Sequence, residues 1–311
     1  MLSCHQIDDI LKKKRNTMKK VLFSVLAATL MLTVTQPAQA EDQKVLAIID
    51  SAINSNNFPS IIQEACFTAN DSFALNVGGS VLCPNGSTFM EGKGAAGNTI
   101  WPASVNNAVY HGDTMVKSAL TVNPNLKIVF VRISNLDKTG GINAFSNRTI
   151  ELALDWVSKN ASKYSIDAVS VSQSSVNPLV LNRCSSDTVT INAVASLTSN
   201  NVPVFVATGN DRRQDVVGFP SCVKGAVGVG ALGSATQLEK ATNTGPGLDM
   251  VAASNVKITK YNGSELKTAG TSVATAIAAA SYVNRNTFKT FGEYLTSLPK
   301  ILIGTASYTR N

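Results

Sequence analysis

The feature that most constrains the fold of this chain is a series of short, almost continuous apolar runs separated by segments with helical periodicity. Runs of this kind are typical of strands that are buried on both faces of a parallel sheet. They occupy residues 44–50, 127–133, 166–172, 202–207, 225–232 and 248–253. Helices are predicted at 106–120, 150–163, 188–199 and 273–282, with a shorter one at 59–65 inside an irregular stretch. The alternation predicts an α/β fold, with a doubly wound, mostly parallel sheet flanked by helices.

The first 40 residues are predicted to be a targeting sequence. A basic segment that includes Lys19 and Lys20 precedes an apolar run at 21–34, and the small-x-small sequence Ala-Gln-Ala ends at residue 40. These are the three parts of a bacterial-type Sec signal peptide. The apolar run is short for a bilayer-spanning helix, so no stable membrane anchor is expected. We therefore expect residues 1–40 to be removed and residues 41–311 to form one domain of a secreted or periplasmic protein.

The charge of the chain does not favour nucleic-acid binding. The whole sequence carries 27 basic and 20 acidic residues, of which six and two precede residue 41, so the net charge falls from +7 to +3 without the leader. No cluster of Lys and Arg is interleaved with aromatic residues, as would be typical of a nucleic-acid interface.

Four cysteines follow the predicted leader: Cys66, Cys83, Cys184 and Cys222. An even number of cysteines in an exported chain predicts two disulfides. Of the three possible connectivities, the local one is preferred, which joins Cys66 to Cys83 and Cys184 to Cys222. The cysteine spacings lack the CxxC pattern of a zinc site and no histidine is near them, so no metal site is predicted.

Polar residues at the ends of the predicted elements suggest a hydrolytic site. Asp50 ends the first strand, Ser272 lies at the start of the last predicted helix, and His111 is the only histidine after residue 40. Acyl-bond hydrolysis by a serine requires a base for its proton, for which imidazole is suited, and a carboxylate that orients the imidazole. Asn210, just after a strand, offers an amide N–H₂ that can stabilise an oxyanion.

Two of these sites, Asp50 and the start of the last helix, also have a structural interpretation. Asp50 could cap a turn at the end of its strand, because Asp is common in turns. Thr271 or Ser272 could act only as the N-cap of the helix that follows.

Four stretches in this order resemble the motifs of subtilisin-like serine proteases (subtilases). They are residues 45–51 around Asp50, His111-Gly112, residues 207–210, and residues 270–274 (GTSVA) around Ser272. The subtilisin triad has the chain order Asp, His, Ser. The resemblance, which covers residues 45–280, implies that Asp50, His111 and Ser272 form a catalytic triad and that Asn210 is the oxyanion donor. It also implies a substrate-binding set of Ser172, Gln173, Ser174, Ser175, Thr208 and Gly209.

The chain departs from the family pattern in ways that lead to further expectations. Ser174 and Ser175 stand where the family usually has paired glycines, which predicts a narrower substrate cleft. Only nine residues separate the predicted cleavage site from Asp50, too few for the pro-segment typical of the family. We therefore expect folding without a covalent chaperone, or with a separate folding partner or inhibitor. No cofactor is expected, and a structural calcium ion could not be located from the sequence.

The leading hypothesis is an exported serine endopeptidase that acts on polypeptides. A catalytically weak or inactive binding protein on the same scaffold is one alternative, because a fold does not dictate a function. A serine esterase or amidase with the same triad is another, although the stretch around Ser272 lacks the second glycine of the GxSxG motif.

Overall fold

The computed structural model describes residues 43–68, 82–97, 111–136, 142–145, 147–285, 290–298, 300–303 and 306–310. The predicted targeting segment, residues 1–40, lies outside them, as does the part of the predicted helix before His111. The chain from Lys44 to Asn311 forms one compact unit.

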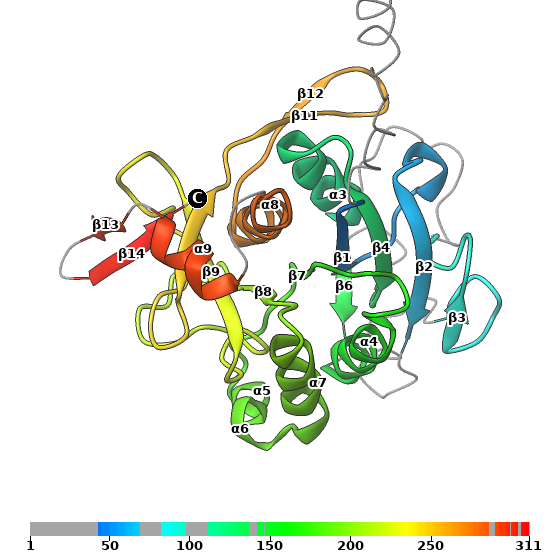
Figure 1. Ribbon diagram of the computed structural model, residues 1–311, viewed down its shortest axis with the longest axis horizontal. Helices are drawn as coiled ribbons and strands as arrows, with labels where there is room; N and C mark the ends of the chain where they lie inside the picture. Colours follow the sequence, from blue (N-terminus) through cyan, green and yellow to red (C-terminus); the bar gives the residue numbers. More distant parts are fainter. Residues whose placement is uncertain are drawn as a thin grey trace, which may run out of the picture. The chain divides into compact units, whose positions relative to one another are not determined.

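Within the described residues, the unit is built around a ten-stranded sheet (Figure 1). Eight neighbouring strands are parallel, and an antiparallel strand lies at each edge. The spatial order is β13 (Lys300–Ile303), β14 (Ala306–Arg310), β10 (Met250–Ala253), β9 (Ala226–Leu232), β8 (Val204–Ala207), β7 (Ala168–Val171), β1 (Val45–Asp50), β4 (Lys127–Arg132), β2 (Ile61–Phe67) and β3 (Phe89–Glu91). Two short antiparallel pairs accompany the sheet: β5 (Ser134–Leu136) with β6 (Ile142–Phe145), and β11 (Lys257–Thr259) with β12 (Glu265–Lys267).

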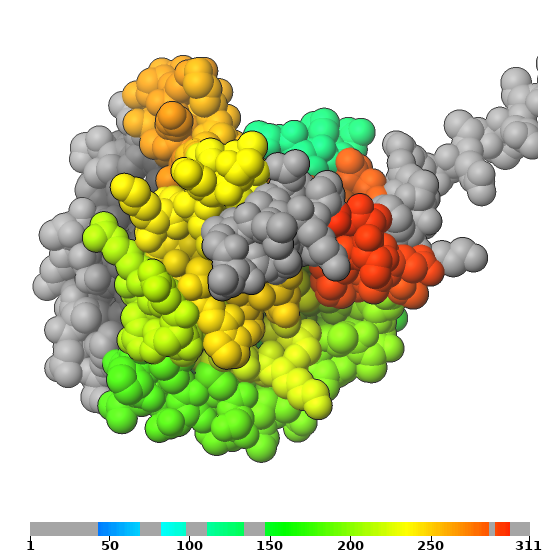
Figure 2. Space-filling view, turned by 90° about the vertical axis from the view of Figure 1, so that its left-hand side faces the viewer, coloured from blue at the N-terminus to red at the C-terminus, as the bar shows by residue number. Residues whose placement is uncertain are grey.

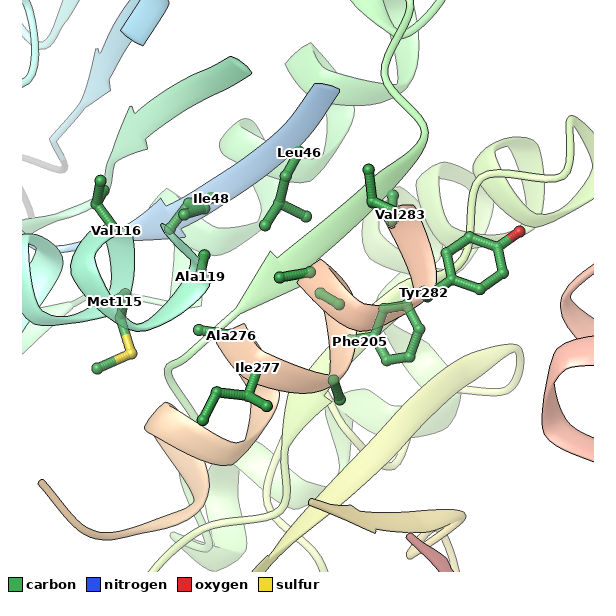
Figure 3. Close-up of a cluster of buried hydrophobic side chains, with 14 of the residues drawn as sticks. Leu46, Ile48, Met115, Val116, Ala119, Phe205, Ala276, Ile277, Tyr282 and Val283 are labelled. Atoms are coloured by element: carbon green, nitrogen blue, oxygen red, sulfur yellow. The ribbon is translucent and has the colours of Figure 1, made fainter. Parts of the chain in front are cut away.

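Helices cover both faces of the sheet, so its central strands are buried on both sides. The described helices are α3 (His111–Val122), α4 (Asn147–Asn160), α5 (Pro178–Leu181), α6 (Arg183–Ser186), α7 (Thr188–Ser199), α8 (Thr271–Val283) and α9 (Phe291–Ser297), with a 3₁₀ turn η1 (Ser55–Asn57). Along β1, Leu46 and Ile48 point into a core shared with α3 and α8, as Figure 3 shows. Val45, Ala47 and Ile49 point to the other face, into a core shared with α4 and α7. This alternation explains why β1 is apolar throughout, as parallel strands are.

Helix α8 is buried along most of its length because it is built from small residues. Each residue from 273 to 280 is buried, and the helix packs against β7, β8, β9 and α3. Alanine side chains permit this close approach to the sheet, so the start of α8 is held firmly over the central strands. None of the helices in the described part of the chain has the length and apolar character needed to cross a bilayer.

The predicted α/β architecture is confirmed, with one local error. The six predicted strands correspond to β1, β4, β7, β8, β9 and β10, and three of the four longer predicted helices to α4, α7 and α8. The described part of the fourth, from His111 onward, corresponds to α3. The helix predicted at 59–65 is wrong, because Ile61–Phe67 is strand β2, which pairs with β4 and β3. Pro59 before an apolar run suggested a helix start, but pairing with neighbouring strands decides the conformation of so short a segment.

Both disulfides form with the predicted local pairing. Cys66 on β2 joins Cys83 with a Cα–Cα distance of 5.9 Å, and Cys184 on α6 joins Cys222 at 5.4 Å. The second bond ties α6 to the segment that leads into β9.

Candidate active site

The predicted catalytic residues gather at the carboxyl edge of the central strands. Asp50 is the last residue of β1, Ser172 directly follows the neighbouring strand β7, and Asn210 follows β8. Helices α3 and α8, which begin at His111 and Thr271, pack against each other. In α/β sheets, ligands bind outside this edge because the loops that follow parallel strands converge there.

Asp50 and His111 form a hydrogen-bonded pair. The imidazole Nδ1 of His111 lies 2.7 Å from Asp50 Oδ1, which also accepts a hydrogen bond from the backbone N–H of Ser51 at 2.6 Å. The Asp50 side chain is fully buried, whereas that of His111 is 23% exposed. An ionised carboxylate only accepts hydrogen bonds, so Nδ1 must carry the proton and donate it. In a neutral imidazole, Nε2 is then left as a proton acceptor.

The pKa of His111 is raised above its ordinary value. Burial acts in the opposite direction, because it disfavours the charged imidazolium and lowers the pKa. The negative charge of Asp50 and its hydrogen bond to the ring both raise the pKa, and together they outweigh burial. The carboxylate therefore strengthens His111 as a base as well as fixing its orientation.

Ser272 is held by a reciprocal pair of hydrogen bonds with Ser172. The Ser272 hydroxyl donates to the backbone carbonyl of Ser172 at 3.0 Å, and the Ser172 hydroxyl donates to the carbonyl of Ser272 at 2.9 Å. Within the described residues, no hydrogen bond joins Ser272 to His111. The N-cap of α8 is Gly270, so the interpretation of Thr271 or Ser272 as the N-cap is wrong.

Asn210 is fixed through its side-chain oxygen beside the start of α8. Its Oδ1 accepts hydrogen bonds from the backbone N–H of Thr271 at 3.0 Å and from the Thr271 hydroxyl at 3.1 Å. With Oδ1 occupied, the amide N–H₂ is directed away from Thr271 and remains available as a donor. A side chain at Gly270, whose φ is +95°, would be strained and would contact the Asn210 amide.

The predicted substrate-binding residues are brought together in the segments that directly follow β7 and β8. Ser172, Gln173 and Thr208 are buried, whereas Ser174 and Ser175 are half-buried. The backbone of Ser175 pairs with that of Phe219: Ser175 N–H donates to Phe219 O at 3.0 Å, and Phe219 N–H donates to Ser175 O at 2.9 Å. A Cβ built on Gly209 would lie 3.0 Å from Ser174 Oγ. A Cβ on Gly218 would lie 2.9 Å from Ser174 Cβ. The Ser174 side chain therefore occupies the space between Gly209 and Gly218.

Two supporting residues could not be found from the sequence. Glu239 accepts a hydrogen bond from Gly270 N–H at 2.7 Å, and Asn243 contacts the loop that contains Asn210. Both lie in a polar loop that has no periodicity and matches no motif, so nothing in the sequence distinguishes them. In the described part of the chain, no group of three or more His, Cys, Asp or Glu side chains is placed to hold a metal ion.

Comparison with known proteins identifies the family. The model of the subtilase family matches residues 94–284, which include His111, Asn210 and Ser272. The chain belongs to the subtilase family. Asp50 precedes the matched stretch, so its assignment depends on its contact with His111.

Solved structures show the same fold. A cold adapted subtilisin-like serine proteinase has a TM-score of 0.51 and 21% identity, and the match covers 78% of this chain and 77% of that one. For the proteases from Pseudoalteromonas arctica, the TM-score is 0.54 and the identity 18%, with 76% and 75% covered. The prenylagaramide maturation protease PagA gives 0.51 and 16%, with 76% and 72% covered. No curated protein sequence matches the chain. These similarities establish a subtilisin-like protease fold.

Proposed function

We propose that this protein is an exported serine endopeptidase that uses Ser272 as nucleophile, His111 as general base and Asp50 to orient His111. Ser272 Oγ bonds to the carbonyl carbon of the substrate, and its proton passes to His111 Nε2. The carbonyl oxygen becomes an oxyanion that accepts hydrogen bonds from Asn210 Nδ2 and the backbone N–H of Ser272. That backbone N–H lies in the first turn of α8, where amides have no partner within the helix.

The remaining steps return every group to its starting state. The C–N bond of the substrate breaks, and His111 gives its proton to the leaving amine. Water then attacks the acyl-enzyme ester while His111 takes its proton, and the released Ser272 oxygen recovers that proton. Before the first step, the Ser272 hydroxyl must turn from the carbonyl of Ser172 toward His111, so the bond at 3.0 Å is the resting orientation in this proposal.

The contact between Asp50 and His111 carries this proposal. A fully buried carboxylate bonded to the ring at 2.7 Å orients the base, and the raised pKa of His111 strengthens it. Two disulfides support an oxidising compartment, in agreement with the predicted signal peptide. The expected substrates are polypeptides, as for proteases of this fold.

Fluorophosphonate labelling of the exported protein, followed by mass spectrometry, tests the proposal. We expect one adduct, on Ser272, an N-terminus at Glu41, and hydrolysis of a denatured polypeptide that stops after labelling. Ser272→Ala should be folded and unlabelled. An unlabelled wild-type protein, or an adduct that persists in Ser272→Ala, contradicts the proposal.

One observation favours a second candidate, an inactive binding protein on the same fold. The Ser272 hydroxyl is bonded to Ser172 rather than to His111. If the wild-type protein binds a polypeptide but is neither labelled nor active, this candidate replaces the first.

A further inference from the structure

The side chain of Asn243 uses its full hydrogen-bonding capacity on the loop formed by residues 208–213. Its Oδ1 accepts from the backbone N–H groups of Asp211 at 2.9 Å and Arg213 at 3.0 Å. Its Nδ2 donates to the carbonyl of Thr208 at 3.1 Å and to Asp211 Oδ2 at 2.9 Å. A side-chain amide has two donor hydrogens and two acceptor lone pairs, and all four are paired here.

The backbone of the loop also approaches Asn243 closely. The N–H of Asn243 donates to the carbonyl of Gly209 at 2.9 Å, and the Asn243 side chain is fully buried. A Cβ on Gly209 would lie only 2.3 Å from Asn243 Nδ2, so only glycine permits this arrangement. In Figure 2 the yellow-green and yellow segments, which include the loops after β8 and β9, lie side by side on one face.

The four residues that Asn243 contacts lie on both sides of Asn210. They are Thr208, Gly209, Asp211 and Arg213. The backbone position of Asn210 is thus set by Asn243, whereas the orientation of its amide is set by Thr271. No hydrogen bond joins Asn243 to Asn210 or Ser272 within the described residues.

We propose that Asn243 is a positioning residue, which holds Asn210 where its amide can stabilise the oxyanion. This inference rests on the proposed function, because it assigns Asn243 a role in the same reaction. A donor stabilises the transition state only if it is in place beforehand. Displacement of Asn210 should therefore lower kcat and leave KM almost unchanged.

The most informative variant is Asn243→Asp, which has nearly the same shape as the native residue. One carboxylate oxygen can still accept from Asp211 N–H and Arg213 N–H. The other replaces the N–H₂ and faces two acceptors, Thr208 O and Asp211 Oδ2. In the double variant with Asp211→Asn, the new N–H₂ of residue 211 donates to the carboxylate oxygen of residue 243. The hydrogen bond between the two side chains is thereby restored, with donor and acceptor exchanged. If Asn243→Asp does not fold, Asn243→Ser, which is smaller and uncharged, takes its place.

The measurements are kcat and KM on a peptide substrate, with the melting temperature as a separate measure of folding. We expect Asn243→Asp to lower kcat about 10²-fold, the loss that a 1 Å misplacement can cause. KM should stay within about threefold, and the added Asp211→Asn should recover about tenfold in kcat. In the Asn210→Ala background, Asn243→Asp should change kcat by less than about threefold, because residues that act through one another are not additive.

Thr242→Val is the matched control. Thr242 is buried in the same loop, but its hydroxyl bonds to Ala231 on β9. Thr242→Val should lower the melting temperature without changing kcat. The inference is overturned if Asn243→Asp lowers kcat equally with and without Asn210, or if it lowers only the melting temperature. A wild-type protein that is neither active nor labelled overturns the proposed function and this inference together, whereas an active enzyme with additive effects overturns only the inference.

Discussion

The two parts of the candidate site are held in place by different physical means. The acid–base pair, Asp50 and His111, depends on charge: a buried carboxylate lies 2.7 Å from an imidazole whose pKa it raises. The nucleophile cluster, Ser272 with Ser172, Asn210 and Thr271, is joined by hydrogen bonds between neutral groups, at 2.9 to 3.1 Å. The function of the pair should therefore respond to pH and to loss of charge, and that of the cluster to changes in geometry.

Ser272→Ala should have the largest effect on activity and little effect on stability. Loss of the nucleophile should lower kcat by about 10⁶, because the remaining groups cannot form an acyl-enzyme. Only one neutral hydrogen bond is lost, to Ser172, since Ser172 still donates to the carbonyl of residue 272. The free energy of unfolding should fall by about 1 kcal/mol. Steady-state kinetics on a peptide substrate measures the loss of kcat, and thermal unfolding measures the loss of stability.

Thr275→Val is the control for Ser272→Ala. Thr275 donates a hydrogen bond at 2.7 Å to Thr271 O within the same helix. It should show a similar loss of stability with full activity. If Ser272→Ala loses several times more stability than Thr275→Val, the Ser272 hydroxyl contributes more to folding than one neutral hydrogen bond.

Asp50→Asn should lower kcat by about 10⁴ with the fold intact. Because Asp50 Oδ1 accepts from both Ser51 N–H and His111 Nδ1–H, the amide would keep its oxygen at that position. The imidazolium that forms when His111 takes the Ser272 proton would then lose its negatively charged partner. Steady-state kinetics on a peptide substrate measures this loss. Asp167→Asn is the control, because Asp167 accepts a hydrogen bond from Val45 N–H at the opposite edge of the sheet. If both variants lose activity equally, the effect is not specific to the acid–base pair.

Asn210→Ala should lower kcat by about 10²–10³ with little change in KM. KM should change little because the Asn210 amide stabilises charge that develops only in the transition state. This variant therefore tests the nucleophile cluster rather than the acid–base pair. Thr271→Val removes a hydroxyl that donates to Asn210 Oδ1 and accepts from Gly209 N–H at 3.3 Å, but it keeps the backbone N–H contact with Asn210. Each neutral hydrogen bond is worth about 1 kcal/mol, so that control should lose at most about 30-fold. A large KM increase in Asn210→Ala would assign the amide to substrate binding instead.

The pH dependence of activity should report the charge on Asp50. Only neutral His111 can act as base, so kcat/KM should fall about tenfold per pH unit on the acidic side. Since the pKa of His111 is raised, the midpoint should lie above about 6.5. In Asp50→Asn, burial remains without the opposing charge, so the midpoint of the residual activity should move to lower pH. An unchanged midpoint contradicts the assignment.

The same pKa shift predicts how stability depends on pH. A raised pKa in the folded state means that the folded protein binds the proton more tightly than the unfolded chain. The stabilisation is fully present below about pH 6.5 and is lost as pH rises through the folded-state pKa. Thermal unfolding of the wild type should show this loss across that window, and His111→Gln should not.

The sequence predicted the sheet and the acid–base pair better than the details of the nucleophile cluster. Strands such as β1 and β8 are recognisable because burial on both faces leaves an apolar run. Asp50, His111 and Ser272 could be predicted as a triad because each lies at an element end and matches a family motif. The helix predicted at 59–65 is wrong because the pairing of β2 with β4 and β3 is set by residues distant in the chain.

The contacts of the nucleophile cluster could not be predicted because they join residues far apart in the chain. Ser172 and Ser272 are 100 positions apart, and Asn210 and Thr271 are 61 apart. Ser and Asn in polar loops usually bond to water or to neighbouring backbone, so their residue type does not identify a long-range partner.

Ser174→Gly should have the smallest effect, on substrate selectivity rather than on the chemical step. The Ser174 side chain lies between Gly209 and Gly218, next to the residue that precedes Asn210. Its removal should raise kcat/KM for substrates with a large side chain over those with a small one by about tenfold, the scale of a methylene-sized change in a pocket. Peptides that differ only in the residue before the scissile bond measure the change.

Ser175→Gly is the matched control for selectivity. The Ser175 hydroxyl accepts a hydrogen bond from Asn177 N–H at 3.3 Å, and its backbone pairs with Phe219. Its side chain is engaged with Asn177, so its loss should leave the preference almost unchanged. Equal shifts in both variants would mean that backbone freedom, rather than the space taken by Ser174, limits the substrate. A shift confined to Ser174→Gly would mean that substrate selectivity is set by the space that this uncharged side chain occupies, and so by geometry rather than by charge.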